Sequence, residues 1–195
     1  HQQGEHKLGT CERFIIRTNA DGAEDYKLVT APEDTVSRET WRDLVPHQSG
    51  RLLLGFQLTH QHLTRLERVN GLPCLIVRET ATGVEHDIAF DEEAYSLGLG
   101  GSLEFETTNL RFVYSSMTTP QETYDYDLIA RERTLRKRQE VPSGHDPAAY
   151  VTRRLLAKTA DGEEVPITLV HRADIKLPAP TLLYGYGSYG ISLPA

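Results

Sequence analysis

The sequence is poor in cysteine, methionine and tryptophan, and it has no long apolar run. Its 195 residues include two cysteines, one methionine and one tryptophan. Cys11 and Cys74 lie far apart and share no metal-binding spacing, so the sequence favours buried, reduced thiols over a disulfide framework. No apolar stretch approaches the roughly 20 residues that a membrane-spanning helix needs. We therefore expect no membrane partner.

Positive charge is also in short supply. The formal net charge is −7 at pH 7, whereas general nucleic-acid binders neutralise phosphates with clustered Lys and Arg, so we expect no nucleic-acid partner. The basic run from Arg131 to Arg138 is interpreted as a solvated strand or loop, with a nucleic-acid patch as the alternative. No signal peptide is visible, but residue 1 is His rather than Met, so we expect the native N-terminus to lie upstream. The expected location is the cytoplasm, with the periplasm as the alternative.

Helical periodicity is scarce, and short apolar segments alternate with turn signals. Asp21-Gly22 and Asn70-Gly71 are typical of hairpin turns. The expected strands are Cys11–Thr18, Tyr26–Thr30, Trp41–Val45, Leu52–Thr59, His62–Val69, Cys74–Arg78, Val84–Phe90, Tyr95–Leu99, Leu103–Glu106, Leu110–Tyr114 and Tyr124–Leu128. Their spacing of about 8 to 12 residues predicts a mainly β fold, either a sandwich, a barrel or a propeller. Asp127 to Gln139 is the best helical alternative, although its apolar stripe is thin.

The composition changes after Val141. Residues 142–149 contain proline, glycine and serine and are predicted to form a linker. This places the expected domain boundaries at residues 1–141, 142–149 and 150–195.

The segment after the linker begins with a hairpin and ends in tyrosines and glycines. Tyr150–Lys158 and Val165–His171 are expected to be strands joined by an Asp-Gly turn, and Ala179–Leu183 is expected to be a short buried strand. Leu182–Gly190 then interleaves three glycines with three tyrosines. Because glycine permits tight turns and positive φ, the pattern predicts a turn that presents phenol rings from a fixed backbone.

Two motif matches in the same segment are weak. Gly185, Gly187 and Gly190 fit the Gly-x-Gly-x-x-Gly pattern of dinucleotide sites, but this pattern also needs a following helix and an acidic residue about 20 positions later. The Gly-x-Ser-x-Gly nucleophile pattern fails at Ser188 because Tyr186 occupies the first glycine position. Ser188 is therefore predicted to be a turn residue.

Two charged or ligating clusters remain. His60 and His62 would share one face of a strand and could bind a metal, but no third ligand is near in sequence, so we favour a polar loop and predict no metal. Asp91-Glu92-Glu93 is expected in a loop between blades, with the steering of cationic peptides as the alternative.

Four segments of the later part of the chain match a known pattern in order and spacing. They are Tyr114–Pro120, Glu140–Pro142, Asp161–Ile167 and Leu183–Gly190. These segments resemble the prolyl oligopeptidase family of serine peptidases, and its oligopeptidase B (protease II) branch most closely. The resemblance implies a seven-bladed β-propeller that caps an α/β-hydrolase domain. The chain would then be an internal fragment with the last two to three antiparallel blades, followed by the first strands of the hydrolase domain.

The resemblance also implies roles for two tyrosines. In similar proteins the second tyrosine of Tyr-Gly-Tyr-Gly donates its hydroxyl to the oxyanion of the reaction, and this position is Tyr186 here. Tyr189 matches a position that lines the substrate pocket. The serine, acid and histidine of the family would lie downstream of Ala195, so the chain alone is expected to be inactive, and no cofactor is implied. The alternative is that the tyrosines pack at the domain interface.

The implied reaction is hydrolysis of short peptides through an acyl-enzyme, after basic residues. Relatives of the oligopeptidase B type often carry acidic residues just after the tyrosine motif, whereas Pro194 occupies the first such position here and argues against a preference for paired basic residues. The alternative function is a non-enzymatic β-propeller-like binding module. In either case, open blade edges are expected to make the chain self-associate.

Overall fold

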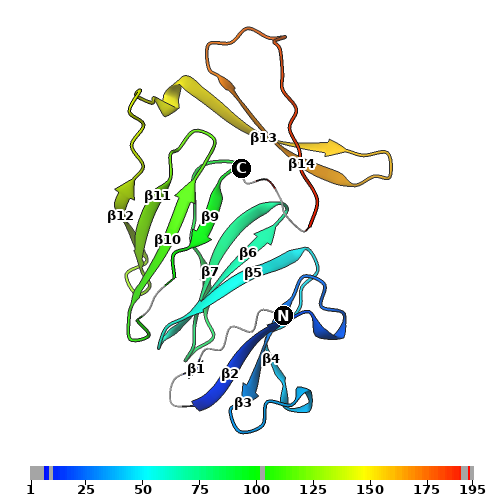
Figure 1. Cartoon of the computed structure of the whole chain (residues 1–195), viewed down its shortest axis with the longest axis vertical. Coiled ribbons are helices and arrows are strands. Elements are labelled where there is room, and N and C mark those ends of the chain that lie inside the picture. The colour runs from blue at the N-terminus through cyan, green and yellow to red at the C-terminus, as the bar shows by residue number, and fades with distance from the viewer. Residues whose placement is uncertain (1–6, 9–10, 102–103, 190–192, 194–195) are drawn as a thin grey trace.

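The regular secondary structure of the described residues is almost entirely antiparallel β-strand. The computed structural model describes residues 7–8, 11–101, 104–189 and 193. Within these residues, three four-stranded sheets are stacked beside one another and one two-stranded hairpin lies at one end of the stack (Figure 1). Helix in this described part is confined to three short 3-10 turns, and none of it is long and apolar enough to cross a membrane.

Each sheet is a meander in which strands pair with their neighbours in sequence. The first sheet contains β1 (Lys7–Leu8), β2 (Cys11–Thr18), β3 (Lys27–Pro32) and β4 (Arg42–Val45). The second contains β5 (Arg51–Leu58), β6 (His62–Val69), β7 (Leu72–Glu79) and β8 (Glu85–Asp87). The third contains β9 (Ser96–Leu99), β10 (Asn109–Ser115), β11 (Glu122–Asp127) and β12 (Glu132–Arg138). Four-stranded meanders of this kind are the blades of β-propellers.

The turn between β6 and β7 confirms the expected hairpin chemistry. Asn70 has φ 50° and Gly71 has φ 79°, so both central residues are left-handed, as a type I′ turn requires. The turn closes a register in which Val69 pairs with Leu72 and His62 pairs with Glu79.

Apolar side chains fill the spaces between neighbouring sheets. The cluster between the second and third sheets contains the buried residues Leu75, Val77, Ile88, Leu110, Phe112, Tyr114, Tyr126 and Leu128. The cluster between the first and second sheets contains Ile15, Leu28, Leu53, Leu58 and Leu63. Because successive side chains of a strand point to opposite faces, the second sheet contributes to both clusters and holds the three sheets together.

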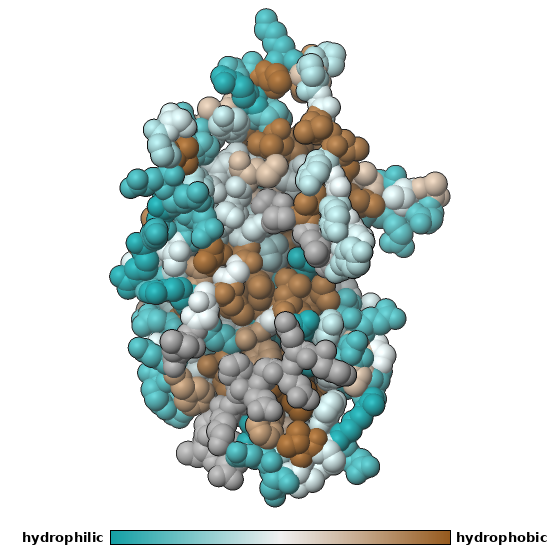
Figure 2. Space-filling view, in the orientation of Figure 1, coloured by the Kyte–Doolittle hydropathy of each residue, from teal (hydrophilic) through white to brown (hydrophobic). Residues whose placement is uncertain are grey.

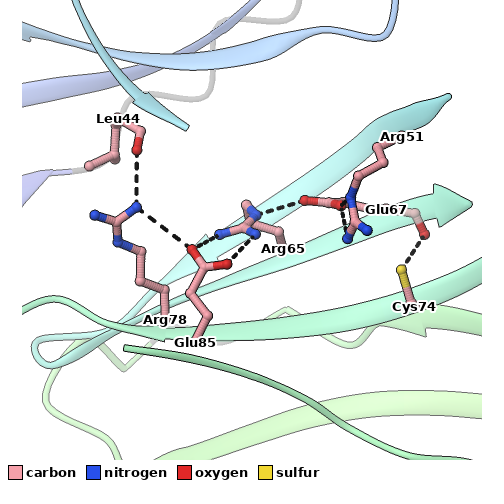
Figure 3. Close-up of polar contacts among 7 residues, drawn as sticks. All are labelled: Leu44, Arg51, Arg65, Glu67, Cys74, Arg78 and Glu85. Carbon is pink, nitrogen blue, oxygen red and sulfur yellow. Dashed lines mark hydrogen bonds and ion pairs between the residues drawn. The ribbon is translucent and has the colours of Figure 1, made fainter. Parts of the chain in front are cut away.

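A ladder of charged side chains crosses the second sheet on the face directed at the first sheet (Figure 3). Arg65 Nε donates to Glu67 Oε1 at 2.7 Å, and its two terminal nitrogens donate to the carboxylate of Glu85 at 2.8 and 2.9 Å. The side chains of Arg65 and Glu67 are each only 5% exposed. Hydrogen bonds from Arg65 hold the pKa of the Glu85 carboxyl below its usual range. Buried charges of this kind are tolerated only while they remain paired.

Both ends of the ladder extend beyond these three residues. Arg51 of β5 contacts Glu67 from the other side, with Nη2 to Oε2 at 2.7 Å. Arg78 of β7 donates to the carbonyl of Leu44 in β4 at 3.1 Å. The ladder therefore links the second sheet to the first.

Cys74 lies beside the ladder on β7 and is a free thiol. Its Sγ donates to the carbonyl of Glu67 at 3.6 Å. Burial raises the pKa of the thiol to about 11, so the group stays protonated and unreactive at neutral pH. The side chain of Cys11 is not among those described.

Three expectations about the blade region need correction. The helical alternative at Asp127–Gln139 is not realised, because its central part is strand β12. Residues 104–106, expected to be part of a strand, have no strand structure and bend at 105–106, and Leu103 lies outside the described residues. Phe105 there packs against the core between the first and second sheets, and its carbonyl accepts from His60 N at 2.9 Å, so the segment reaches across to the second sheet instead of pairing with β9. The expected strand Val84–Phe90 is shortened to β8.

Candidate functional site

A two-stranded hairpin follows the third sheet. The side chain of Asp146 accepts from Ala148 N at 3.0 Å and so caps a short 3-10 turn in the linker. β13 (Tyr150–Lys158) and β14 (Glu164–Arg172) then pair along their whole length. Figure 1 shows this hairpin across one end of the stacked sheets.

The buried strand expected at Ala179–Leu183 does not form. The chain after β14 has no regular structure in the described residues, and Leu182 and Leu183 are 89% and 83% exposed. Pro178 and Pro180 remove two backbone donors from this segment, and a strand needs a neighbour to pair with. The apolar composition of Ala179–Leu183 therefore does not indicate that this segment pairs with another strand of the described residues.

Tyr184, Tyr186 and Tyr189 follow in the same irregular segment, with exposed fractions of 73%, 49% and 91%. Tyr186 is the least exposed of the three. Within the described part of this segment, Tyr189 has a left-handed backbone, with φ 55°. A Cβ atom added at Gly185 or Gly187 would meet no other atom within 4 Å, so the glycines are not needed here for close approach.

The tyrosine segment, defined here as residues 182–189, offers phenol hydroxyls away from the propeller core. A phenol can donate one hydrogen bond, which is the chemistry that oxyanion stabilisation needs. The structure places Tyr186 and Tyr189 in the same irregular segment but puts no serine–histidine–acid set beside them within the described residues. Gly190 and Pro194 lie outside the described residues, and Ser188 lies in a bend, as predicted.

The two histidines considered as metal ligands, His60 and His62, differ in their burial. His62 begins β6 and is 7% exposed, and burial lowers the pKa of its imidazole. His60 precedes the strand, is about half exposed and faces Glu106 at 3.5 Å. They do not share a strand face as the sequence suggested, because the strand starts two residues later than His60.

The basic run on β12 is tied to carboxylates of β11. Arg136 Nε contacts Asp125 at 2.8 Å, and Arg138 Nε contacts Glu122 at 2.6 Å. Hydrogen bonds from Arg111, and then from Arg136, hold the pKa of Asp125 below its usual range. Two cations of the run, Arg136 and Arg138, are thus paired with carboxylates within the sheet.

Asp91, Glu92 and Glu93 occupy the loop between the second and third sheets, as expected. The Glu92 carboxylate accepts hydrogen bonds from Tyr114 Oη at 2.7 Å and from the hydroxyl of Thr119 at 2.7 Å. Burial opposes ionisation of Glu92, but these hydroxyls hold its pKa below the usual range. Sequence reasoning missed this structural role, since nothing in the pattern links a loop carboxylate to hydroxyls more than twenty positions away.

Comparison with known proteins gives one family. The model of the family described as "Prolyl oligopeptidase, N-terminal beta-propeller domain" matches residues 2–139. Dipeptidyl aminopeptidase BI of Pseudoxanthomonas mexicana is 44% identical over 185 residues, which cover 93% of this chain and 25% of that protein. Among solved structures, oligopeptidase B of Leishmania major has a TM-score of 0.85 at 28% identity, over 96% of this chain and 28% of that chain.

A second solved structure agrees. Oligopeptidase B of Trypanosoma brucei, in a closed form with covalently bound antipain, has a TM-score of 0.83 at 31% identity, again over 96% of this chain and 28% of that chain. The chain therefore spans about a quarter of the length of the curated relative described above. The stacked four-stranded meanders and the family match over residues 2–139 agree, and the chain belongs to the prolyl oligopeptidase family, as part of its N-terminal β-propeller domain.

Proposed function

We propose that the intact protein is a serine-type oligopeptidase that hydrolyses short peptides through an acyl-enzyme, after basic residues. The observation that carries the proposal is family membership combined with an exposed tyrosine segment that lies outside the blade cores. The curated and solved relatives described above are named as peptidases, which favours an enzyme over a binding module.

The proposal divides the chain into residues 1–141 as the C-terminal blades of the propeller, residues 142–149 as a hinge and residues 150–195 as the start of an α/β-hydrolase domain. Two observations support it. The family match ends at residue 139, and the hairpin beyond it carries side chains that no core covers. Those exposed side chains include Leu155, Leu156 and Val165.

Apolar surface continues past the hairpin. Figure 2 shows brown side chains in the upper part of the molecule, where the hairpin and the chain after it lie. Ile175, Leu177, Leu182 and Leu183 are all at least 40% exposed. Patches of this kind mark surfaces that other structure covers, and the rest of the hydrolase domain is the occupant that the proposal assigns.

In this scheme Tyr186 donates its hydroxyl to the oxyanion that develops on the scissile carbonyl, and Tyr189 lines the substrate pocket. Donors already aimed at the developing charge stabilise the transition state more than the ground state. The exposed fraction of Tyr186, 49%, leaves its ring free of the propeller core. Hydrolysis of fluorogenic Arg-containing peptides by the full-length protein, abolished by a serine-directed inhibitor, tests the reaction class.

A second candidate function is release of dipeptides from a free amino terminus, which the 44% identity with a dipeptidyl aminopeptidase favours. The two candidates differ in what they require of the substrate. An oligopeptidase needs only an internal bond within reach, whereas a dipeptidyl aminopeptidase must also recognise the terminal ammonium group.

We expect the full-length enzyme to cleave an acetylated dipeptidyl-arginine substrate and its free-amine counterpart with kcat/KM values within about tenfold of each other. The measurement is a paired fluorogenic assay at one pH and ionic strength. A loss of about 10⁴-fold on acetylation, as expected when a site built to bind an N–H group finds it blocked, would assign the second function instead.

The 195-residue chain is proposed to self-associate through its unpaired blade edges. Edge strands offer free backbone donors and acceptors to other chains, and within the described residues the first and third sheets each stack on only one other sheet. We expect a dimer or larger species by light scattering at about 50 μM, a concentration in the range where exposed edges associate. A monodisperse monomer at that concentration would show that the edges are blocked.

A further inference from the structure

The hairpin rests on the propeller at three separate places, the first of which is the turn between β6 and β7. A Cβ atom added at Gly71 would lie 2.9 Å from Pro166 Cγ of β14 and 3.5 Å from Arg154 Nη2 of β13. The turn and the hairpin are therefore in direct contact, with no room for a side chain between them. Glycine at this position serves both the left-handed turn and the close approach.

The second contact comes from the loop between the second and third sheets. Glu93 Oε2 accepts from the backbone N–H of Arg154 at 2.9 Å, and Glu93 Oε1 accepts from Arg153 Nη1 at 3.3 Å. The Glu93 carboxylate thus accepts from a backbone N–H on the edge of β13 that is not paired with β14. Charge-assisted hydrogen bonds of this type are stronger than neutral ones.

The third contact fixes the linker. His145 Nε2 lies 2.7 Å from the carbonyl of Thr118 in the loop between β10 and β11. The His145 ring also stacks on Tyr150, the first residue of β13, with centroids 5.9 Å apart. The linker that leads into β13 therefore contacts the third sheet, whereas Arg154 and Pro166 of the hairpin contact the second sheet.

The hairpin face directed at the propeller carries buried polar atoms that lack hydrogen-bond partners. Thr152, Arg154 and Pro166 share one face, since alternate residues of a strand point the same way and Leu156 pairs with Pro166. Thr152 Oγ1 and Arg154 Nη2 are buried without a hydrogen-bond partner. Unpaired buried polar atoms oppose docking, so this contact differs from the apolar cores between the sheets.

We propose that Gly71, Glu93 and Thr118 form a docking seat that holds the β13–β14 hairpin in one orientation, with Glu93 as the anchor. The three places lie on two different sheets, so the seat fixes both position and rotation. Because the tyrosine segment follows β14, the seat residues become positioning residues for Tyr186, a consequence that rests on the proposed function. The seat itself does not depend on that function.

Amide hydrogen exchange of the 195-residue chain, followed residue by residue by NMR, tests the seat without any activity assay. Glu93→Ala removes the acceptor, and we expect the Arg154 amide to exchange about tenfold faster. Asp91→Ala is the matched control, because Asp91 lies in the same loop with a side chain that is 97% exposed and reaches Arg133 instead of the hairpin. It should leave the Arg154 amide within about twofold of the wild-type rate.

Gly71→Ala tests the same seat from its other side. Gly50→Ala is its control, since both glycines have φ 79° but a Cβ at Gly50 would meet no atom within 4 Å. We expect Gly71→Ala to accelerate exchange at Arg154 as Glu93→Ala does, and Gly50→Ala to leave it unchanged, with the buried amides of Leu75 and Phe112 protected in all variants. Unchanged exchange in both seat variants would overturn the proposal, as would acceleration in only one of them or an equal effect of Gly50→Ala.

Discussion

Under the proposed function, Tyr186→Phe is expected to lower kcat of the full-length protein about 10²–10³-fold while KM stays within about threefold. The substitution removes one hydroxyl and keeps the ring, so binding that depends on shape is retained. Because the oxyanion exists only in the transition state and the intermediate, a donor aimed at it acts on kcat and not on ground-state affinity.

Tyr184→Phe is the matched control for this experiment. It removes an equivalent hydroxyl two residues away on the same exposed segment, where the side chain is 73% exposed, and we expect kcat to change less than about threefold. Steady-state kinetics on one fluorogenic peptide, with active-site titration to count competent enzyme, gives both values. Equal losses in the two variants would assign the effect to packing of the segment and not to the oxyanion.

Arg65→Ala is expected to reduce the free energy of unfolding by about 3 kcal/mol. The guanidinium is nearly inaccessible and bonds both Glu67, which is equally buried, and Glu85. Removing it leaves the Glu67 carboxylate with Arg51 alone and opens a void between the first and second sheets. Truncation of one partner is costly because the other charge stays buried.

Urea denaturation of the chain, followed by circular dichroism, measures this loss. Arg136→Ala is the comparison, because Arg136 also contacts a carboxylate but its side chain is 55% exposed, so it should cost only about 0–1 kcal/mol. A loss below about 1 kcal/mol for Arg65→Ala would mean that water or rearranged side chains replace the ladder.

Strands with strong apolar patterns were predictable from the sequence. The expected bounds of β2, β6 and β13 coincide with the observed ones, Cys11–Thr18, His62–Val69 and Tyr150–Lys158. In each case a local signal, such as the Asn70-Gly71 turn after β6, agreed with the packing that the sheet imposes. Such strands can be predicted from the sequence because their local conformational preference agrees with the packing of the folded sheet.

Other elements could not be predicted because their conformation depends on neighbours distant in sequence. Ala179–Leu183 is apolar, but the described residues provide no strand beside it. The bend at 105–106 depends on where Phe105 packs. Apolar composition indicates that a segment avoids water and does not identify the surface that it will meet.

The candidate site also contains some residues that the sequence predicted and others that it did not. The tyrosine positions came from a motif that the sequence carries whole, whereas the contacts of Glu93 and Gly71 with the hairpin involve Arg154 and Pro166, which lie more than sixty positions downstream. No periodicity links such pairs, and only the arrangement of hairpin and blades reveals them. The proposed role of the tyrosines still depends on residues outside this chain.

The most direct test is a structure of the full-length protein with a serine-directed inhibitor that forms a tetrahedral adduct. The account predicts Tyr186 Oη at about 2.7–3.1 Å from the oxyanion of that adduct. An oxyanion held only by other donors, with the Tyr186 hydroxyl beyond about 4 Å and outside hydrogen-bonding range, would contradict it.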